Sequence, residues 1–367
     1  MEQVTAYKPT GSEQKPRRID TSRILVGILG SLLTLLGLYA GFIYLRDSKD
    51  SRLVIGIVAI VWGVGGVASL FFMANWIVES LPTKWTNRIQ PYVFVGPAAF
   101  FLIVFLALPV VSTVILSFKN ADGTAFVGLQ NYIQIFSQRI MIEAWRNNLL
   151  WLVIGTPLVI GLGLLIAMLA DRSKFERVAK SLIFMPMAIS MVGAGIIWKF
   201  VFDVNPNVGL INAAVTSVGG TNQDWLRLIQ PWNNIFLIIV MVWLQTGFAM
   251  VLISAAIKGV DGDLLEAARV DGASEITIFL RIIIPSIRGT LITVTTTTII
   301  FTLKIFDIVV VMTGGQFGTE VIGVRFFREM FTEFDQGLGS AIAVVLLLAV
   351  IPVMIYNLRQ FSQRETF

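Results

Sequence analysis

The sequence predicts an all-α polytopic membrane protein with about eight transmembrane helices. Hydrophobic residues make up 56% of the 367-residue chain and charged residues only 14%, and the mean hydropathy is +0.79. The apolar residues gather into eight runs of about 20 residues or more, which is the length that a helix needs to cross the hydrocarbon core of a bilayer. Too little polar chain remains for a separate large soluble domain.

The missing residue types narrow the range of functions. The chain has no cysteine and no histidine. Disulfides and thiolate metal sites are therefore excluded, and a metal site or a proton relay is disfavoured because histidine is the commonest metal ligand and general base. The net charge of +5 comes from basic residues scattered among loops, which favours a role in membrane orientation over nucleic-acid binding.

Each apolar run is predicted to be a span because of its length and its polar boundaries. The first run is far longer than the apolar part of a signal peptide and lacks a cleavage site, so we expect an uncleaved span. Gly37 and Gly41 form a GxxxG pattern there, and Gly63, Gly65 and Gly66 follow in the second run; we expect these small residues to pack helix against helix. The predicted spans are 24–45, 53–78, 92–116, 149–169, 182–202, 235–257, 291–312 and 338–358.

The distribution of basic residues predicts the orientation of the chain. If the amino-terminal tail is cytoplasmic, the loops on its side of the membrane hold 17 lysines and arginines and the loops on the other side hold 9. Cytoplasmic loops of membrane proteins carry the excess of positive charge. We therefore expect both tails, residues 1–23 and 359–367, to be cytoplasmic, together with the polar segment 258–290.

This 258–290 segment has the pattern of two short helices. Asp261 or Asp263 can cap the first helix, and Asp271-Gly272 supplies the left-handed turn that ends it. The second helix carries an apolar stripe made of Ile276, Phe279, Leu280 and Ile283. Each helix is too short to be stable alone, so the pair must be held by packing. Two interpretations remain open: a docking site for a partner protein, or a loop that caps its own helix bundle.

The same segment resembles the EAA loop of binding-protein-dependent ATP-binding-cassette (ABC) importer permeases. The family pattern is EAA, three residues, Gly, nine residues, Ile, one residue, Leu, Pro. This chain matches it in register at Glu266, Ala267, Ala268, Gly272, Ile282 and Pro285, with Ile284 in place of the leucine. It departs from the family at Val260-Asp261, where Ile-Pro is frequent, and at Arg288-Gly289, where a second proline is frequent. The resemblance implies a coupling helix that docks on a cytoplasmic ATPase through Glu266, Ala267, Ala268, Asp271, Gly272, Ala273 and Ser274.

Three other stretches are similar to the carbohydrate branch of this family. Residues 126–132 (FVGLQNY) resemble the FxGLxNY stretch of carbohydrate permeases. Residues 304–319 (KIFDIVVVMTGGQFGT) are similar to the corresponding segment of the alpha-glucoside and glucosylglycerol permeases, and residues 340–348 continue this likeness. The resemblance covers roughly residues 92–364.

The resemblance also implies the domain organisation. A six-helix permease core would occupy residues 91–358 and include the coupling loop at 258–290. Two extra helices would precede it, in residues 24–90. The chain would then be one of two permease subunits in a heterodimer. It has no GxxxxGK[ST] motif, so ATP and Mg would be bound by a separate ABC ATPase homodimer and this chain would be no enzyme.

The implied setting is the bacterial cytoplasmic (inner) membrane, with lipid around the helices. An extracytoplasmic sugar-binding protein would deliver the substrate to the loops 118–147, 203–233 and 313–337. Closure of the ATPases would then rock the two permeases about a central site, which is an alternating-access mechanism. No cofactor and no nucleic acid is expected on this chain.

Polar side chains at membrane depth are costly and face a cavity or a partner helix. Lys304 and Asp307 lie three residues apart and can pair on one helix face, either as a structural ion pair or as a coupling site. The threonines of 293–298 are expected to bond to helix carbonyls. A sugar site needs apolar faces and a few polar groups, and three spans supply this mixture. The expected substrate path is Met187, Met191, Leu244, Gln245, Phe248, Phe301, Thr302 and Ile305, positions similar to those that line the path in carbohydrate permeases.

Three alternatives to a sugar importer remain. An ion-coupled secondary transporter would use Lys304 and Asp307 as its coupling-ion site. A membrane scaffold would show no substrate-dependent behaviour. An ABC permease for a non-sugar solute would keep the EAA pattern and change only the cargo.

Overall fold

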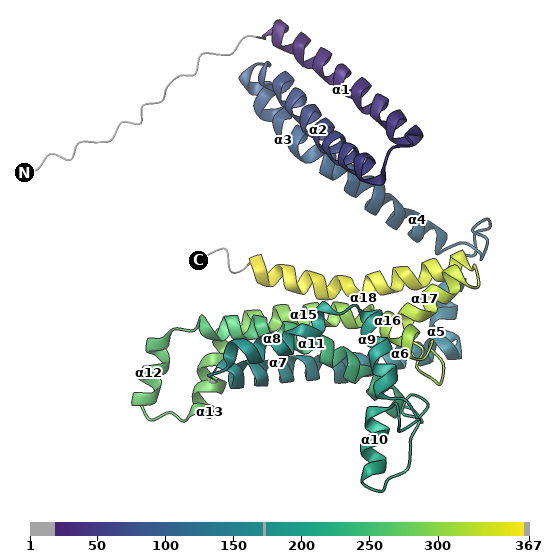
Figure 1. Cartoon of the computed structure of the whole chain (residues 1–367), viewed down its shortest axis with the longest axis vertical. Coiled ribbons are helices and arrows are strands. Elements are labelled where there is room, and N and C mark those ends of the chain that lie inside the picture. Colours follow the sequence, from purple (N-terminus) through teal and green to yellow (C-terminus); the bar gives the residue numbers. More distant parts are fainter. Residues whose placement is uncertain (1–18, 172–173, 363–367) are drawn as a thin grey trace, which may run out of the picture. The chain divides into compact units, whose positions relative to one another are not determined.

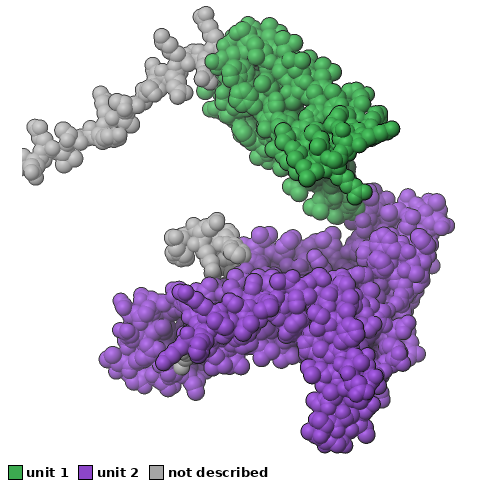
Figure 2. Space-filling model, viewed as in Figure 1, with its two compact units in different colours: residues 1–110 green, residues 111–367 purple. Residues whose placement is uncertain are grey.

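The computed structural model of the protein describes residues 19–171 and 174–362. The predicted tails 1–23 and 359–367 therefore lie largely outside the described residues. The described chain is almost entirely helical and holds no named strand among these residues, so the predicted all-α class is confirmed. Contacts divide the chain into two compact units, with the boundary after Val110 (Figure 2).

The described residues contain six helices that are long and apolar enough to cross a membrane, or eight spans if two bent helix pairs each count as one. The expectation of about eight spans is thereby confirmed. The six helices are Thr21–Asp47, Arg52–Glu79, Thr83–Leu116, Arg139–Asp171, Trp232–Lys258 and Gln336–Arg359. The bent pairs are Glu176–Ala188 with Met191–Val201, at 103°, and Glu275–Ser286 with Arg288–Leu303, at 70°.

Unit 1 consists of α1 (Thr21–Asp47), α2 (Arg52–Glu79) and α3 (Thr83–Leu102), and the unit boundary falls in α4 (Leu108–Leu116), which follows a π-helical turn (Figure 1). Asp20 and Ser51 cap α1 and α2 by accepting backbone N–H groups. The most apolar window of α2 has no buried residue at all. Such a helix is apolar on every side, as expected for one that lipid surrounds.

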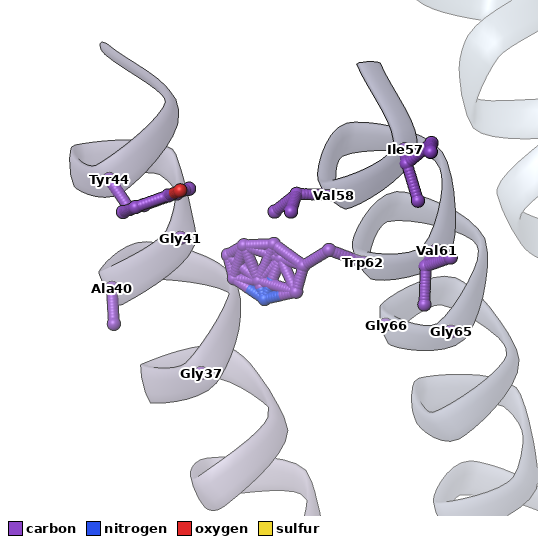
Figure 3. Close-up of a pocket in the computed structure, with 10 residues that line it drawn as sticks. All are labelled: Gly37, Ala40, Gly41, Tyr44, Ile57, Val58, Val61, Trp62, Gly65 and Gly66. Atoms are coloured by element: carbon purple, nitrogen blue, oxygen red, sulfur yellow. The ribbon is translucent and has the colours of Figure 1, made fainter. Parts of the chain in front are cut away.

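Helices α1 and α2 pack through small residues and one polar contact. A Cβ atom at Gly41 would lie 1.3 Å from the Trp62 ring, so glycine alone lets the indole lie against α1. The hydroxyls of Thr34 and Ser69 bond across the interface at 2.8 Å. Gly37 differs from its GxxxG partner Gly41, because a Cβ atom at Gly37 would meet no heavy atom within 4 Å. Both glycines line an open recess of about 690 Å³ around Trp62 (Figure 3).

Unit 2 is built around α11, whose most apolar window is 56% buried. Helices α7, α8, α9, α15 and α16 pack around it and form the main apolar core. A second, smaller core joins α5, α6, α17 and α18 through residues such as Ile135 and Ile342. The bounds are α5 (Gln130–Ser137), α6 (Arg139–Leu150), α7 (Thr156–Asp171), α8 (Glu176–Phe184), α9 (Met191–Val201), α10 (Leu210–Ser217), α11 (Trp232–Lys258), α12 (Gly262–Val270), α13 (Glu275–Ile278), α14 (Ile284–Ser286), α15 (Arg288–Leu303), α16 (Asp307–Met312), α17 (Ile322–Phe331) and α18 (Gln336–Ser362).

The predicted fifth span, 182–202, is not one continuous helix. A 3-10 turn with Pro186 near its start ends the helix that begins with α8, and Ile189 is extended. The hydroxyl of Ser190 then caps α9 by accepting the N–H of Gly193 at 3.1 Å. Proline and a serine cap together stop one helix and start another, which produces the bend of 103°.

The predicted seventh span, 291–312, is also wrong as a single helix. Helix α15 ends at Leu303, and α16 starts at Asp307 after a short non-helical break. The side-chain amide of Asn148 donates to the carbonyl of Leu303 at 3.3 Å, which supplies a donor that the ended helix no longer provides. A tertiary contact therefore replaces a helical hydrogen bond at this point.

Candidate functional site

The 258–290 segment folds as two short helices, as its sequence predicts. Of the two candidate caps, Asp261 is the one used: its carboxylate accepts the N–H of Asp263 at 3.0 Å. The first helix, α12, ends at Val270, and Gly272 in the turn that follows has φ +79°. The N–H of Ala273 bonds back to the carbonyl of Ala268 at 3.0 Å, a closure typical of helices that end in a left-handed residue.

The second helix, α13, begins at a serine cap, where the Ser274 hydroxyl accepts the N–H of Thr277 at 3.2 Å. An ion pair of 2.9 Å between Arg269 and Glu275 links the two helices. Figure 1 shows α12 and α13 projecting from one end of unit 2. The residues implied in docking lie on this projection: Glu266, Ala267, Asp271, Gly272 and Ser274 are exposed, and Ala268 and Ala273 are partly buried.

The predicted apolar stripe of the second helix needs a correction. Residues Phe279–Ile283 form a π-helical turn, so the regular spacing of an α-helix is lost there. Ile276 and Leu280 are exposed, at 72% and 58%, whereas Phe279 and Ile283 are partly buried. Together with Val270, which is 87% exposed, they give the projection apolar side chains that no described residue covers.

The segment continues into α15 through a bend of 70°. Pro285 lies in the last helical turn before the bend, and α15 starts at Arg288. On its other side, the segment follows directly from the end of α11 at Lys258. The projection is therefore connected in sequence to two long helices of unit 2, α11 and α15.

Charged side chains fix the end of α11 next to the projection. Lys180 on α8 forms ion pairs with Asp171 and with Glu176, the latter at 2.6 Å. Glu176 also pairs with Lys258, and the Ser254 hydroxyl donates to Asp171 at 2.8 Å. These contacts join α7 and α8 to the last turns of α11, next to the point where the 258–290 segment begins.

A cavity of about 350 Å³ lies in unit 2, lined by three segments. Six of the eight residues predicted for the substrate path line it: Met187, Met191, Leu244, Gln245, Phe248 and Phe301. Ile189, Thr297 and Thr298 complete the lining and were not predicted. The threonines do bond back to helix carbonyls, Thr297 at 2.9 Å and Thr298 at 2.8 Å, but they also face the cavity.

Two predicted path residues do not line this cavity. Thr302 is fully buried, and its hydroxyl donates to the carbonyl of Thr298 at 2.8 Å. Ile305 is 1% exposed and belongs to the main core. Thr302 lies in the last turn of α15 and Ile305 in the break that follows it, and packing against neighbouring helices buries both.

The predicted pairing of Lys304 with Asp307 rested on a shared helix face, and the break in the helix removes that basis. Lys304 caps the end of α15 and Asp307 starts α16. No ion pair joins the two side chains in the part of the chain that the structure describes. A coupling-ion site made from these two residues therefore has no support from the geometry.

Four buried asparagines lie at the end of α11 opposite the projection, and we call Asn147, Asn148, Asn233 and Asn234 the asparagine cluster. The amides of Asn147, Asn233 and Asn234 donate to carbonyls of a glycine-rich loop, residues 313–320, whereas Asn148 donates to the carbonyl of Leu303. Asn147 donates to Gly318 at 2.8 Å and to Glu320 at 2.7 Å. Asn233 donates to Phe317 at 2.6 Å. Each asparagine is at most 2% exposed. The signal in the sequence was a pair of Asn-Asn doublets, each directly before an apolar run, which the sequence analysis missed.

The glycine-rich loop holds an unusual backbone conformation. Phe317 has φ +58°, which is a strained value for a bulky residue. Its ring is 44% exposed, and the Arg227 guanidinium lies 4.8 Å from the ring centroid. The bonds from the asparagine cluster to the neighbouring carbonyls hold this conformation in place.

Two buried carboxylates, Glu320 at the end of the loop and Glu329 on α17, lie outside the membrane-spanning segments. Burial raises the pKa of Glu320, which the Arg328 guanidinium at 3.3 Å partly opposes. Burial likewise raises the pKa of Glu329, which pairs with Arg325. Arg328 also donates to the carbonyl of Gly314 at 3.0 Å. This end of unit 2 is therefore fixed by carboxamides and ion pairs.

Comparison with known families decides the identity of this architecture. The family described as "Binding-protein-dependent transport system inner membrane component" matches residues 159–365, which is more than half of the chain. The chain belongs to this family. The permease is accordingly a multi-pass protein of the inner membrane and a transport subunit, and the matched range includes the cavity and the 258–290 segment.

Two curated relatives cover most of the permease. The osmoprotective compounds uptake permease protein GgtC of Synechocystis sp. is 52% identical over 74% of this chain and 99% of its own length. The alpha-glucoside transport system permease protein AglF of Rhizobium meliloti is 42% identical over 86% of this chain and 98% of its own length. The predicted resemblance to this branch of ABC permeases is confirmed.

A solved structure shows the same fold. A chain of a bacterial ABC transporter involved in the import of the acidic polysaccharide alginate superposes with a TM-score of 0.66 at 20% sequence identity. The match covers 77% of the permease and 99% of that chain. The predicted ABC importer permease fold is confirmed.

Proposed function

We propose that the permease is one of two membrane subunits of an ATP-driven importer for alpha-glucosidic sugars or glucosylglycerol. The observation that carries this proposal is the position of the cavity. Helices α11 and α15, which flank the projecting 258–290 segment, supply six of its nine lining residues: Leu244, Gln245, Phe248, Thr297, Thr298 and Phe301. One pair of helices thus connects the proposed docking site to the proposed substrate site.

The composition of the cavity suits a sugar. Its volume of about 350 Å³ lies within the range of about 300–1,000 Å³ for small-molecule sites. The rings of Phe248 and Phe301 offer apolar faces to a pyranose ring, and the Gln245 amide can bond to hydroxyl groups. The names of the two relatives, which refer to alpha-glucosides and osmoprotective compounds, support this class of cargo.

The projection formed by α12 and α13 supplies the docking element for the ATPase. Its exposed apolar side chains need a cover, and a cleft in a cytoplasmic ATPase homodimer would provide one. Arg288 and Phe301 lie thirteen residues apart on α15, a rise of about 20 Å. We expect displacement of α12 to move the cavity wall through α15, because the segment that carries α12 continues into α15 through the bend of 70°.

This arrangement supports alternating access with both termini in the cytoplasm. ATP and Mg would be bound on the ATPase subunits, and a second permease would complete the central site. An extracytoplasmic binding protein would deliver the substrate at the opposite end of the permease, where the asparagine cluster holds the glycine-rich loop.

The test is transport by the complete complex in proteoliposomes. The ATPase subunits face the lumen, and ATP is enclosed there. Sucrose, maltose, trehalose and glucosylglycerol would be compared with glycine betaine, each with the cognate binding protein. Uptake of one of these glucosides that requires ATP supports the proposal. Uptake of betaine alone would indicate a non-sugar ABC permease, and ATP-independent counterflow by the isolated chain would indicate a secondary transporter.

A further inference from the structure

A second groove in unit 2 lies between α15 and α18, on a different face of α15 from the cavity. It has a volume of about 640 Å³. Its wall on α15 is one helical face, because the lining positions recur every three or four residues. The lining residues are Arg288, Leu291, Ile292, Thr295, Thr296 and Ile299 on α15, and Pro352, Val353 and Tyr356 on α18.

We infer that this groove binds an anionic glycerophospholipid from the leaflet on the side of the 258–290 segment. The phosphate would lie at Arg288, and an acyl chain would lie along the groove toward Ile299. This inference concerns a binding site other than the proposed sugar cavity.

The length of the groove fits one leaflet. Arg288 and Ile299 are eleven residues apart on α15, which is about 16 Å along a helix. Half of the hydrocarbon core of a bilayer is about 15 Å thick. A lipid whose phosphate is at Arg288 would therefore place its acyl chain along the whole groove and end near the middle of the membrane.

The charges of the groove favour an anionic headgroup. None of its nine lining residues is acidic. Arg288 is exposed at the start of α15, and Arg359 is exposed in the last turn of α18, one turn beyond Tyr356. A guanidinium binds a phosphate through two parallel hydrogen bonds, and basic pockets between membrane helices are known to hold anionic headgroups.

The apolar residues favour a lipid over another helix. Most of the lining is apolar, since it includes Leu291, Ile292 and Ile299. The small residues on which close contacts between membrane helices rely are limited to Thr295 and Thr296. Tyr356 is 52% exposed, and tyrosine is enriched at the membrane–water interface, where a headgroup lies. The hydroxyl of Thr296 already donates to the carbonyl of Ile292 at 2.9 Å. An acyl chain beside it would therefore leave no unpaired hydroxyl donor there.

The test is native mass spectrometry of the delipidated, purified complex titrated with phosphatidylglycerol or phosphatidylcholine of identical acyl chains. The wild type should bind phosphatidylglycerol more tightly. Arg288→Gln should weaken phosphatidylglycerol about fivefold, the effect of one basic group near a lipid surface, and leave phosphatidylcholine unchanged. Thr295→Phe, which fills the groove, should weaken both lipids.

Arg88→Gln is the matched control, because Arg88 is an exposed arginine of α3 that does not line this groove. It should bind both lipids as the wild type does. Equal affinity of wild type and Arg288→Gln for phosphatidylglycerol would overturn the inference. So would release of a second membrane subunit by Thr295→Phe with an unchanged lipid count, since the groove would then be a subunit interface.

Discussion

The side-chain amide of Asn147 on α6 donates a hydrogen bond of 2.8 Å to the carbonyl of Gly318, a residue 171 positions later in the chain. The same carbonyl also accepts from Gln230 and, at 3.4 Å, from Asn234. Three side chains from two distant stretches of sequence thus meet on one backbone oxygen. This contact fixes the glycine-rich loop to the ends of α6 and α11.

Asn147→Ala should lower the stability of unit 2. It removes the donors for two carbonyls, those of Gly318 and Glu320, in a site where the asparagine is 2% exposed. Loss of buried hydrogen bonds of this kind costs about 2 kcal/mol, which corresponds to a fall of about 4–8 °C in melting temperature. The measurement is thermal unfolding of the purified protein in detergent.

Asn207→Ala provides the comparison for this experiment, because Asn207 lies exposed in a loop. Its melting temperature should stay within about 1 °C of the wild type, as expected for a surface substitution. If Asn147→Ala and Asn207→Ala have the same melting temperature, the asparagine cluster does not stabilise the loop.

The sequence predicted those parts of the fold that depend on local pattern. Length and hydropathy located the spans, and the Asp271-Gly272 pair located the turn with φ +79° at Gly272. The breaks after Leu303 and near Ile189 were missed. Hydropathy averaged over a run does not detect a hydrogen-bond donor from a distant part of the chain, such as Asn148. Local pattern specifies helices, and contacts between distant residues decide where they stop.

The candidate site shows the same division. Residues such as Gln245 and Phe301 were selected because polar and aromatic groups occurred at comparable depth on different spans, and the structure brings them to one cavity. Thr302 has equally suitable chemistry and lies one residue beyond Phe301, yet it is buried. Its direction depends on where α15 ends, which no single stretch of sequence encodes.

Gly272→Ala should weaken attachment of the ATPase subunit. At φ +79° a Cβ atom is strained by about 1 kcal/mol, so the turn between α12 and α13 would shift and the docking surface would change. An effect of this size lowers the affinity about fivefold. The measurement is the amount of ATPase that co-purifies with the tagged permease.

Gly262→Ala is the matched control for the turn. A Cβ atom added at either glycine would meet no heavy atom within 4 Å, but Gly262 lacks a positive φ and lies at the start of α12. It should retain the ATPase as the wild type does. Equal loss of ATPase from both variants would mean that side-chain bulk, and not the conformation at Gly272, disturbs the contact.

Phe301→Ala should raise the half-saturation constant of uptake about tenfold. The substitution removes an apolar surface that would cover a sugar ring in the cavity, and a loss of about 1.4 kcal/mol of binding energy is a tenfold change. The control is Phe200→Ala, because Phe200 is 59% exposed and does not line the cavity. Identical uptake curves for the two variants would remove Phe301 from the substrate path.

Glu320→Gln should reduce the dependence of stability on pH. Burial raises the pKa of Glu320 above its ordinary value of 4.5, so the folded protein keeps this proton to a higher pH than the unfolded chain does. Unfolding therefore releases a proton in the window above 4.5, and the free energy of unfolding falls as the pH rises through it. The melting temperature of the wild type, measured from pH 4.5 to 8, should decline accordingly.

The variant should decline less over the same range, because glutamine does not titrate and Arg328 keeps its bond to the carbonyl of Gly314. A residual slope is expected from Glu329, whose pKa is raised in the same direction. Glu333→Gln, at a carboxylate that is 47% exposed, should follow the wild type. A Glu320→Gln curve parallel to the wild-type curve would show that the Glu320 carboxyl titrates alike in the folded and unfolded chains, and that its burial beside the loop has no effect on stability.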